Sequence, residues 1–245
     1  MRKVQLIETF AALAMQLVAT RCVLCRQAIT STSDHQNQQN LCDYCCDDLN
    51  TFDYSWFDDL MLRPDIERGI TRPKFDRLLS VAPYQWPYNQ WIGDMKFREK
   101  FAIAELMGHQ LADLLDTLIQ ANPALKPDVL LPMPIHRQRR FSRGYNQSYL
   151  LASVLAKRLN IALDIKALKR IKATNAQSQL GKRERNKNIK NAFAYQGNQY
   201  QHVALIDDVI TTGATVNEAC KVLSASGVAA ISVWTICATP LGNKQ

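Results

Sequence analysis

Apolar residues in this chain occur either in short continuous runs or at helical spacing. The continuous runs predict buried strands of a parallel sheet, the first of them an edge strand, at residues 75–84, 128–131, 190–196, 203–206 and 231–237. Helical spacing predicts amphipathic helices at residues 91–119, 149–159 and 217–225, with Gly227 capping the last. Residues 161–168 are predicted to be a strand or extended. This alternation predicts an α/β fold, a parallel sheet with flanking helices.

Residues 203–215 carry the most informative pattern, VALIDDVITTGAT. The apolar strand ends in two adjacent carboxylates, Asp207 and Asp208, and a tight loop then leads to helical spacing from about Val216. Ligands of open α/β sheets bind beyond the carboxyl ends of the strands, and a helix N-terminus with nearby hydroxyls favours a phosphate. The predicted phosphate-binding residues are Thr211, Thr212, Gly213, Ala214 and Thr215.

The two carboxylates need a separate explanation, because they would repel a phosphate if they faced it. Sugar hydroxyls, which need hydrogen-bond acceptors, and a divalent cation such as Mg²⁺ would explain them. An ordinary strand-to-helix junction with a capping threonine fits the loop as well, but it leaves Asp207 and Asp208 without a role. The pattern therefore predicts a phosphorylated sugar bound at the end of this strand.

Length and composition limit the class of protein. The 245 residues suffice for one full core and a small second module. No apolar run reaches the roughly 20 residues that a membrane-spanning helix needs. The first 20 residues have a basic tip and apolar positions, as a signal peptide does, but polar residues interrupt them and the spacing is helical. We therefore expect an N-terminal amphipathic helix, no membrane span and a cytoplasmic protein.

The formal net charge of +8 is unevenly distributed. Residues 166–190 contain nine Lys or Arg and one acid, and residues 137–143 add four arginines at a predicted strand-to-helix junction. A basic face of this kind indicates a polyanionic ligand, whereas a solvated lysine-rich helix would carry interspersed acids. Residues 170–190 have little apolar content, so we expect them to form a cationic lid over a bound polyphosphate.

Five of the seven cysteines lie between residues 22 and 46, in two Cys-x-x-Cys pairs and one adjacent position. Two such pairs at this separation predict a structural zinc ribbon with four thiolate ligands, Cys22, Cys25, Cys42 and Cys45. A disulfide is the alternative, disfavoured because nothing indicates export. Four thiolates close the coordination sphere, which argues against a catalytic zinc. Cys46 and His35 are left unassigned.

Turn-forming residues between the ribbon and the first strand suggest a linker. Pro64, Gly69 and Pro73 place the expected boundary near residue 70. We therefore expect an N-terminal helix and zinc ribbon in residues 1–70 and a second domain in residues 71–245. Residues 43–67 hold eight acids and one arginine, which suggests that this module docks on a basic protein partner.

The pattern at 203–215 resembles, position by position, the phosphoribosyl-pyrophosphate (PRPP) motif of type I phosphoribosyltransferases. That motif has four apolar residues, two acids, two apolar residues and then Thr-Thr-Gly-x-Thr. The resemblance implies that Asp207 and Asp208 are the catalytic pair, which accepts hydrogen bonds from the ribose hydroxyls directly or through Mg²⁺-bound water. It also implies that Thr211 to Thr215 hold the 5′-phosphate.

Three further segments resemble the ComF family of competence-associated proteins, also called GntX-like. They are MKFREK at 95–100, Arg-Gly-Tyr-Asn-Gln at 143–147, and a lid pattern from Arg170 to Phe193. The resemblance implies a type I phosphoribosyltransferase-like domain after a zinc ribbon, with Arg143, Lys182 and Arg185 meeting the pyrophosphate. It also implies a link to DNA uptake, with single-stranded DNA and a competence helicase as partners. It names no acceptor.

Two functions from different classes remain open at this point. The first is transfer of phosphoribose from PRPP to an unknown acceptor, with Mg²⁺ and release of pyrophosphate. The second is a non-catalytic role, either as a PRPP sensor or as an adaptor that binds single-stranded DNA during natural transformation. Both use the same basic face, so the sequence leaves the choice between them open.

Overall fold

The structure is a computed structural model that describes residues 21–29, 40–97, 100–135, 144–172 and 189–242. Its contacts divide the chain into two units, Met1–Asn50 and Thr51–Gln245. The expected N-terminal helix, the arginines of 137–143 and most of the expected lid lie outside the described residues. None of the described helices combines the length and the apolar character that crossing a membrane requires.

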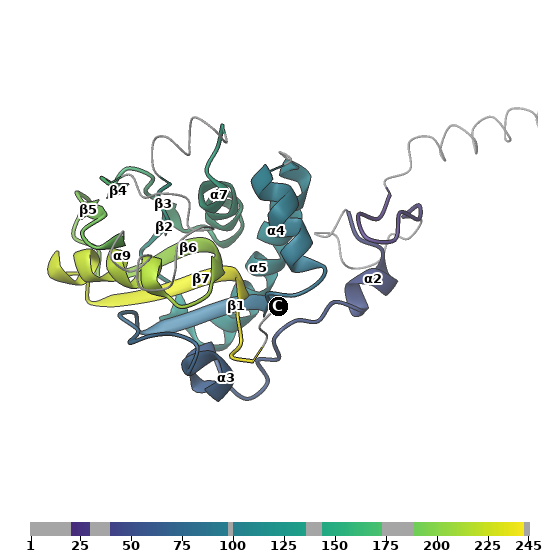
Figure 1. Ribbon diagram of the computed structural model, residues 1–245, viewed down its shortest axis with the longest axis horizontal. Coiled ribbons are helices and arrows are strands. Elements are labelled where there is room, and N and C mark those ends of the chain that lie inside the picture. The colour runs from purple at the N-terminus through teal and green to yellow at the C-terminus, as the bar shows by residue number, and fades with distance from the viewer. Residues whose placement is uncertain (1–20, 30–39, 98–99, 136–143, 173–188, 243–245) are drawn as a thin grey trace, which may run out of the picture. The chain divides into compact units, whose positions relative to one another are not determined.

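The larger unit alternates strands and helices, as predicted (Figure 1). Its strands are β1 (Arg77–Pro83), β2 (Val129–Pro132), β3 (Ala162–Leu163), β4 (Leu168–Arg170), β5 (Phe193–Tyr195), β6 (His202–Ile210) and β7 (Ala230–Ala238). Its helices are η1 (Leu60–Leu62), α3 (Pro64–Glu67), α4 (Tyr88–Phe97), α5 (Phe101–Ala121), η2 (Pro123–Leu125), α7 (Gln147–Leu159) and α9 (Ala214–Ala225). In the smaller unit the structure describes one helix, α2 (Asp43–Asp47).

Five parallel strands form the central sheet in the order β1-β7-β6-β2-β3, with β1 at an edge as predicted. The chain leaves β2 through α7 toward β3, and it leaves β6 through α9 toward β7, in the opposite direction along the sheet. The strand order therefore reverses between β2 and β6. Such a switch point opens a crevice at the carboxyl ends of the two strands, where open α/β sheets bind ligands.

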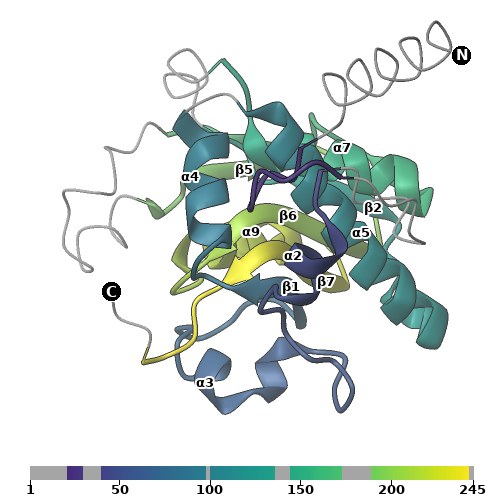
Figure 2. The same cartoon turned by 90° about the vertical axis from the view of Figure 1, so that its right-hand side faces the viewer.

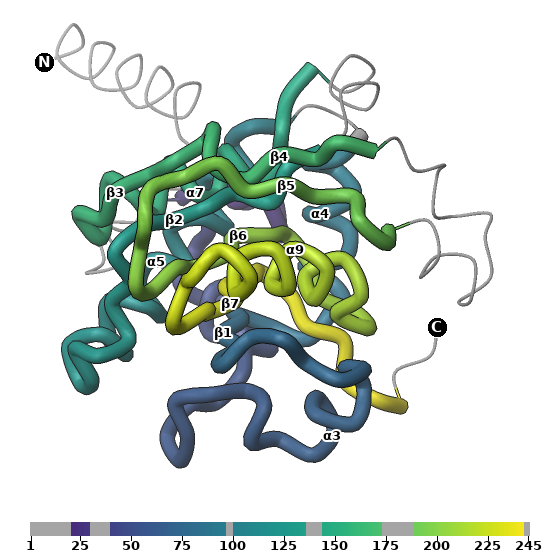
Figure 3. Tube along the Cα trace, turned by 90° about the vertical axis from the view of Figure 1, so that its left-hand side faces the viewer, coloured from purple at the N-terminus to yellow at the C-terminus, as the bar shows by residue number. Residues whose placement is uncertain are grey.

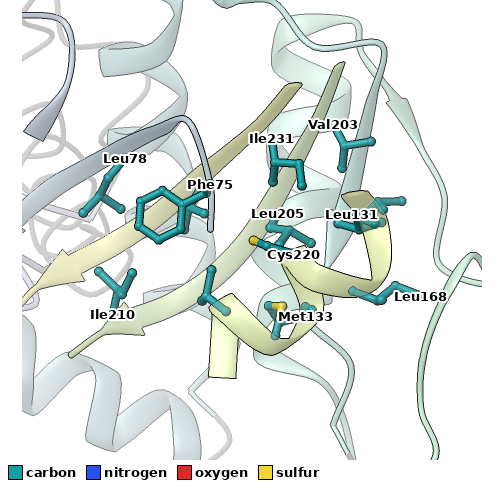
Figure 4. Packing of buried hydrophobic residues seen from close by; sticks show 14 of the residues in the cluster. Phe75, Leu78, Leu131, Met133, Leu168, Val203, Leu205, Ile210, Cys220 and Ile231 are labelled. Carbon is teal, nitrogen blue, oxygen red and sulfur yellow. The ribbon is translucent and has the colours of Figure 1, made fainter. Parts of the chain in front are cut away.

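Helices cover both faces of the sheet. Helices α5 and α7 contact each other, and they contact β1, β7, β2 and β6 on the side that faces the viewer in Figure 2. Helix α9 and the antiparallel pair β4–β5 lie on the other side, shown in Figure 3. Cys220 of α9 packs in one buried cluster with Leu205 and Ile231 of the sheet (Figure 4). The predicted α/β fold with flanking helices is confirmed.

Strand β6 extends past the predicted acidic strand end at Asp207 and Asp208. It continues through Asp207 and Asp208 to Ile210, because β7 continues beside it and pairs Asp207 with Thr235. Its other neighbour ends earlier, since Pro132 of β2 lies level with Ile206. The two acids are therefore part of the strand, in the segment that projects past β2.

Residues 51–70, which we expected in the N-terminal module, pack on the sheet of the larger unit. The N–H of Phe52 donates to the carbonyl of Val81 in β1 at 2.9 Å. Ile66 and Ile70 are buried in the same cluster as the strands. The compact division therefore falls at residues 50 and 51 rather than near 70, because apolar side chains in the expected linker complete the core.

The acids of this segment bind within the larger unit. Asp58 forms an ion pair with Arg77 at 3.0 Å, and Asp65 forms one with Arg63 at 2.8 Å. Asp59 accepts the backbone N–H groups of Met61 and Leu78. These carboxylates fix the fold locally, which weakens the expectation that they select a basic protein partner.

Candidate functional site

The two carboxylates of β6 lie between the ends of two helices. Asp208 is 7% exposed, and its Oδ2 pairs with Lys96 Nζ near the end of α4 at 2.8 Å. Asp207 Oδ1 accepts from the hydroxyl of Ser148 in the first turn of α7 at 2.9 Å, and from the N–H of Asp208 at 2.9 Å. Residues from three separate segments therefore meet at the switch point of the sheet.

Sequence reasoning gave Lys96 and Ser148 no role in this site. Lys96 lies within the MKFREK segment, which resembles the ComF pattern, so its residue type and position carried a signal. Ser148 carried none, because only the tertiary fold brings the start of α7 to the end of β6. The site is thus a cluster of two acids, one cation and one hydroxyl.

Burial and charge determine the ionisation of this cluster. Burial raises the pKa of Asp207, the neighbouring charge of Asp208 raises it further, and the pKa reaches about 7 although Lys96 opposes this change. Burial alone would lower the pKa of Lys96, but the charges of Asp208 and Asp207 outweigh it and the net direction is upward. Lys96 is therefore a cation that compensates a carboxylate pair held partly out of water.

The loop after β6 leaves the start of α9 open. Gly213 is the N-cap residue, with φ of +73°, and no side chain caps the helix. The first N–H groups of a helix have no partner within it, so they remain available to an acceptor. In contrast, the side chain of Asn146 caps α7 by accepting the N–H of Ser148 at 3.1 Å. An uncapped helix start beside hydroxyl side chains is a place where an anion is stabilised.

Glycine is required at position 213 for two reasons. Its backbone lies in the left-handed region, which side chains other than glycine disfavour. A Cβ there would lie 2.9 Å from Cγ2 of Ile70, which is too close for an ordinary contact. The loop therefore turns tightly against the segment that contains Ile70.

The facing side of the crevice follows β2. The carbonyl of Met133 accepts from the Asn146 side chain at 3.1 Å, and the N–H of Met133 donates to Ile206 at 2.9 Å. The hydroxyl of Tyr145 donates to the carbonyl of Met95, next to Lys96. The Tyr145–Asn146 part of the signature thus ties the start of α7 to both β2 and α4.

The four predicted zinc ligands form a second cluster in the smaller unit. The Sγ atoms of Cys22, Cys25, Cys42 and Cys45 all lie within 4.8 Å of one another. Cys25 Sγ and Cys42 Sγ are 3.7 Å apart. Tetrahedral zinc with Zn–S bonds of about 2.3 Å separates its sulfurs by roughly 3.8 Å, so this donor set fits the ion.

These thiols lie close enough to shift one another's pKa. Burial raises the pKa of Cys45, and the three neighbouring thiols raise it further. Burial acts in the same direction on Cys22, but backbone N–H groups of Cys25, Cys42 and Leu24 outweigh it and lower the pKa to about 6. All seven cysteines are described and carry free thiols, so the disulfide alternative finds no support in the structure.

The structure brings some of the predicted residues together and leaves others out. Asp207 and Asp208 lie on the same edge of the sheet as Thr211 to Thr215, and the four cysteines lie together. Arg143, Lys182 and Arg185, predicted to meet the pyrophosphate, lie outside the described residues, as does His35.

Fold and site together define a class: an α/β protein with a parallel sheet, a pair of carboxylates at its switch point and a separate four-cysteine module. Comparison with known proteins specifies it further. The chain is 37% identical over 170 residues to DNA utilization protein YhgH of Escherichia coli strain K12, covering 68% of this chain and 74% of that protein. No protein-family model matches the chain.

Two competence proteins are also similar. Competence protein F of Haemophilus influenzae is 32% identical over 222 residues, covering 87% of this chain and 95% of that protein. Competence protein ComFC of Bacillus subtilis is 30% identical over 176 residues, covering 70% of each. The chain therefore belongs to the ComF family, as its motifs indicated.

Proposed function

We propose that the crevice between β2 and β6 binds PRPP and that the protein transfers its phosphoribosyl group to an acceptor. One observation carries this proposal. Half-buried Asp207 and buried Asp208 lie in the same strand end that leads, within a few residues, to the uncapped start of α9. A phosphorylated sugar needs both features together, an acceptor pair for its hydroxyls and an anion site for its phosphate.

Each side of the site has its own role in this proposal. Asp207 and Asp208 accept hydrogen bonds from the ribose hydroxyls, and Lys96 holds the ionised form of the pair. The hydroxyls of Thr211, Thr212 and Thr215 donate hydrogen bonds to the 5′-phosphate, beside the N–H groups of Gly213 and Ala214. Arg143, Lys182 and Arg185 meet the pyrophosphate, a role that rests on the family resemblance.

The carboxylate pair also fits Mg²⁺. The ion prefers oxygen ligands, keeps several waters and usually binds through one or two carboxylates together with substrate phosphates. Asp207 and Asp208 would hold it directly or through water. When bound, the ion neutralises charge on the pyrophosphate as it leaves.

Transfer at C1 of the ribose depends on positioning and charge. The bond from C1 to the pyrophosphate oxygen breaks through an oxocarbenium-like transition state, and a bond to the acceptor forms. A protein accelerates such a step mainly by orienting the reactants and by stabilising charge. Asp207 and Asp208, by holding the two ribose hydroxyls, fix the ring while C1 reacts.

Calorimetric titration with PRPP, with and without Mg²⁺, tests this proposal. We expect saturable binding at one site that strengthens with Mg²⁺. An assay of pyrophosphate release across candidate nucleobases and amines then identifies the acceptor. No heat of binding at millimolar PRPP would contradict the proposal, and binding without pyrophosphate release would reduce it to PRPP sensing.

A structural zinc ion is the second part of the proposal. We expect one equivalent of zinc per chain, measured by native mass spectrometry, and loss of the fold of the smaller unit on chelation. Cys42→Ser should remove the zinc, whereas Cys220→Ser, a thiol buried in α9, should keep it. Retention of zinc by Cys42→Ser would contradict the four-cysteine site.

A role in DNA handling is the second candidate function. The printed names of the relatives, DNA utilization protein and competence protein, favour it, as does the net charge of +8. In this case the protein is an adaptor for single-stranded DNA, with a competence helicase as a further partner. Its affinity for single strands should fall by about 0.7 log unit per phosphate contact for each log unit of salt. Affinity independent of salt would contradict this role.

A further inference from the structure

We infer that residues 70–74, which contact the phosphate-binding loop, form a cationic wall along one side of it. We further infer that Arg72 in this wall binds the 5′-phosphate. The inference rests on the proposed PRPP site and adds a binding residue to it. No sequence motif indicated this segment. It lies just before the first strand, far in the sequence from the loop that it contacts.

The segment contacts the loop directly. The N–H of Thr71 donates to the carbonyl of Thr212 at 3.2 Å. One residue earlier, Ile70 packs against Gly213 so closely that a Cβ on the glycine would lie 2.9 Å from its Cγ2. The outer side of the loop is therefore formed by this segment.

Asn217, in the first turns of α9, holds the segment in place. Its side-chain Nδ2 donates to the carbonyls of Thr71 at 2.9 Å and Arg72 at 3.3 Å. Its Oδ1 accepts the N–H of Lys74 at 2.9 Å, and its own N–H donates to Gly213 at 2.8 Å. Asn217 is 8% exposed, so these bonds are shielded from water. One buried side chain thus links the loop to its wall.

The conformation of Arg72 is unusual for an arginine. Its φ is +47°, in the left-handed region, where glycine would be accommodated at no steric cost. The turn itself therefore does not explain an arginine, and a function for the side chain does. Arg72 and Lys74 are exposed, and no carboxylate within the described residues pairs with either.

The chemistry of the loop explains the cation. The start of α9 supplies only partial positive charge, and Asp207 and Asp208 lie a few residues before the loop. Arg72 follows Thr71, whose N–H donates to the carbonyl of Thr212. The guanidinium of Arg72 supplies a full positive charge and a bidentate pair of donors for phosphate oxygens. Lys74, two residues further along the same exposed segment, adds a point charge with a smaller effect.

Titrations with PRPP, ribose 5-phosphate and inorganic pyrophosphate test the assignment. We expect Arg72→Gln to weaken the binding of PRPP and ribose 5-phosphate by about tenfold, because an exposed charge-assisted contact with the phosphate is lost, and to leave pyrophosphate affinity unchanged. Arg72→Lys should lose less. Lys157→Gln, the same change of charge at the far end of α7, should change nothing.

Two variants separate binding from folding. Arg72→Gly relieves the left-handed backbone, so it should lose the same affinity while its melting temperature stays equal or rises. In an Asn217→Ala background, where the wall is released, Arg72→Gln should cause little further loss, because the two residues act as one unit. Fully additive losses would overturn the role of Asn217.

The outcomes distinguish this inference from the function on which it rests. If the native protein binds PRPP and Arg72→Gln binds ribose 5-phosphate equally well, the wall is wrong and the PRPP site stands. If Arg72→Gln weakens pyrophosphate as much as ribose 5-phosphate, the cation serves the other end of the ligand and the assignment is also wrong. If the native protein binds neither PRPP nor ribose 5-phosphate, the proposed function fails as well.

Discussion

Aspartates lie at both ends of the strands of the central sheet, which we call the amino edge and the carboxyl edge. The hydrogen-bond partners of these aspartates differ between the two. At the amino edge, Asp76 precedes β1 and accepts the N–H of Ile231 at 2.7 Å. Asp128 precedes β2 and accepts the N–H groups of Gln201 and His202 at 2.8 and 2.9 Å. These carboxylates satisfy backbone donors of neighbouring strands, as structural acids do.

At the carboxyl edge the partners are mainly side chains. Asp208 pairs with Lys96, and Asp207 accepts from Ser148 and from the adjacent N–H. Burial raises the pKa of Asp207 to about 7, so the fold tolerates this pair at a cost in stability. The amino-edge acids therefore stabilise the sheet, whereas the carboxyl-edge acids reduce its stability, as acids that serve the proposed ligand site would.

The largest effect on stability should come from Asp207→Asn and depend on pH. The pKa of Asp207 is about 7 in the folded protein, against about 3.9 when unfolded, so the folded state binds the proton more tightly. Native Asp207 therefore reduces stability progressively as the pH rises from about 4 to 7. The variant should gain on the order of a few kcal/mol at pH 8 relative to pH 4, measured by urea denaturation. Equal pH dependence in both proteins would refute the cost assigned to this acid.

Asp128→Ala should act in the opposite direction. It removes the acceptor of two backbone N–H groups and should lower the free energy of unfolding by about 1–2 kcal/mol. Asp128→Asn keeps an acceptor oxygen and should lose less. PRPP affinity should be unchanged in both variants. If an Asp128 variant lost PRPP affinity but kept the native free energy of unfolding, Asp128 would have a functional role, which would contradict the assignment of the amino-edge acids to stability.

The smallest effect concerns His202 at the amino edge. Its Nε2 lies 2.8 Å from the Ser232 hydroxyl, and burial lowers its pKa although Asp128 opposes the change. Because the folded pKa lies below the unfolded value of about 6.5, stability is full above that value and falls as the pH drops through it. His202→Gln should reduce this acid loss by less than about 1 kcal/mol between pH 7.5 and 5.5. An unchanged acid loss would show that another group causes it.

Local patterns predicted the elements that form the carboxyl edge. The continuous apolar run at 203–206 predicted a buried strand, and β6 contains it; the helix after Gly213 followed from its spacing. The strand end was predicted too early, since pairing of Asp207 with Thr235 in β7 decides where β6 ends. Long-range pairing of this kind has no local signal.

The contacts between β6, α4 and the segment before β1 could not be predicted from the sequence for the same reason. Lys96 lies more than a hundred residues before Asp208 in the sequence. The carbonyls of Thr71 and Arg72, which accept from the Asn217 side chain, also lie more than a hundred residues before it. The expected boundary near residue 70 differs from the compact division at residues 50 and 51 for another reason. Pro64, Gly69 and Pro73 indicated turns, but the burial of Ile66 and Ile70 among them depends on the sheet beneath.

Binding of PRPP to the double variant Asp207→Asn, Asp208→Asn is the decisive test of the proposed carboxylate site. Calorimetry with Mg²⁺ should show an affinity at least about 100-fold weaker than that of the native protein, since both acceptors of the ribose hydroxyls are neutralised. The variant should still be folded during the titration, which a cooperative unfolding transition above the assay temperature would show. A folded double variant that binds PRPP with native affinity would contradict the account.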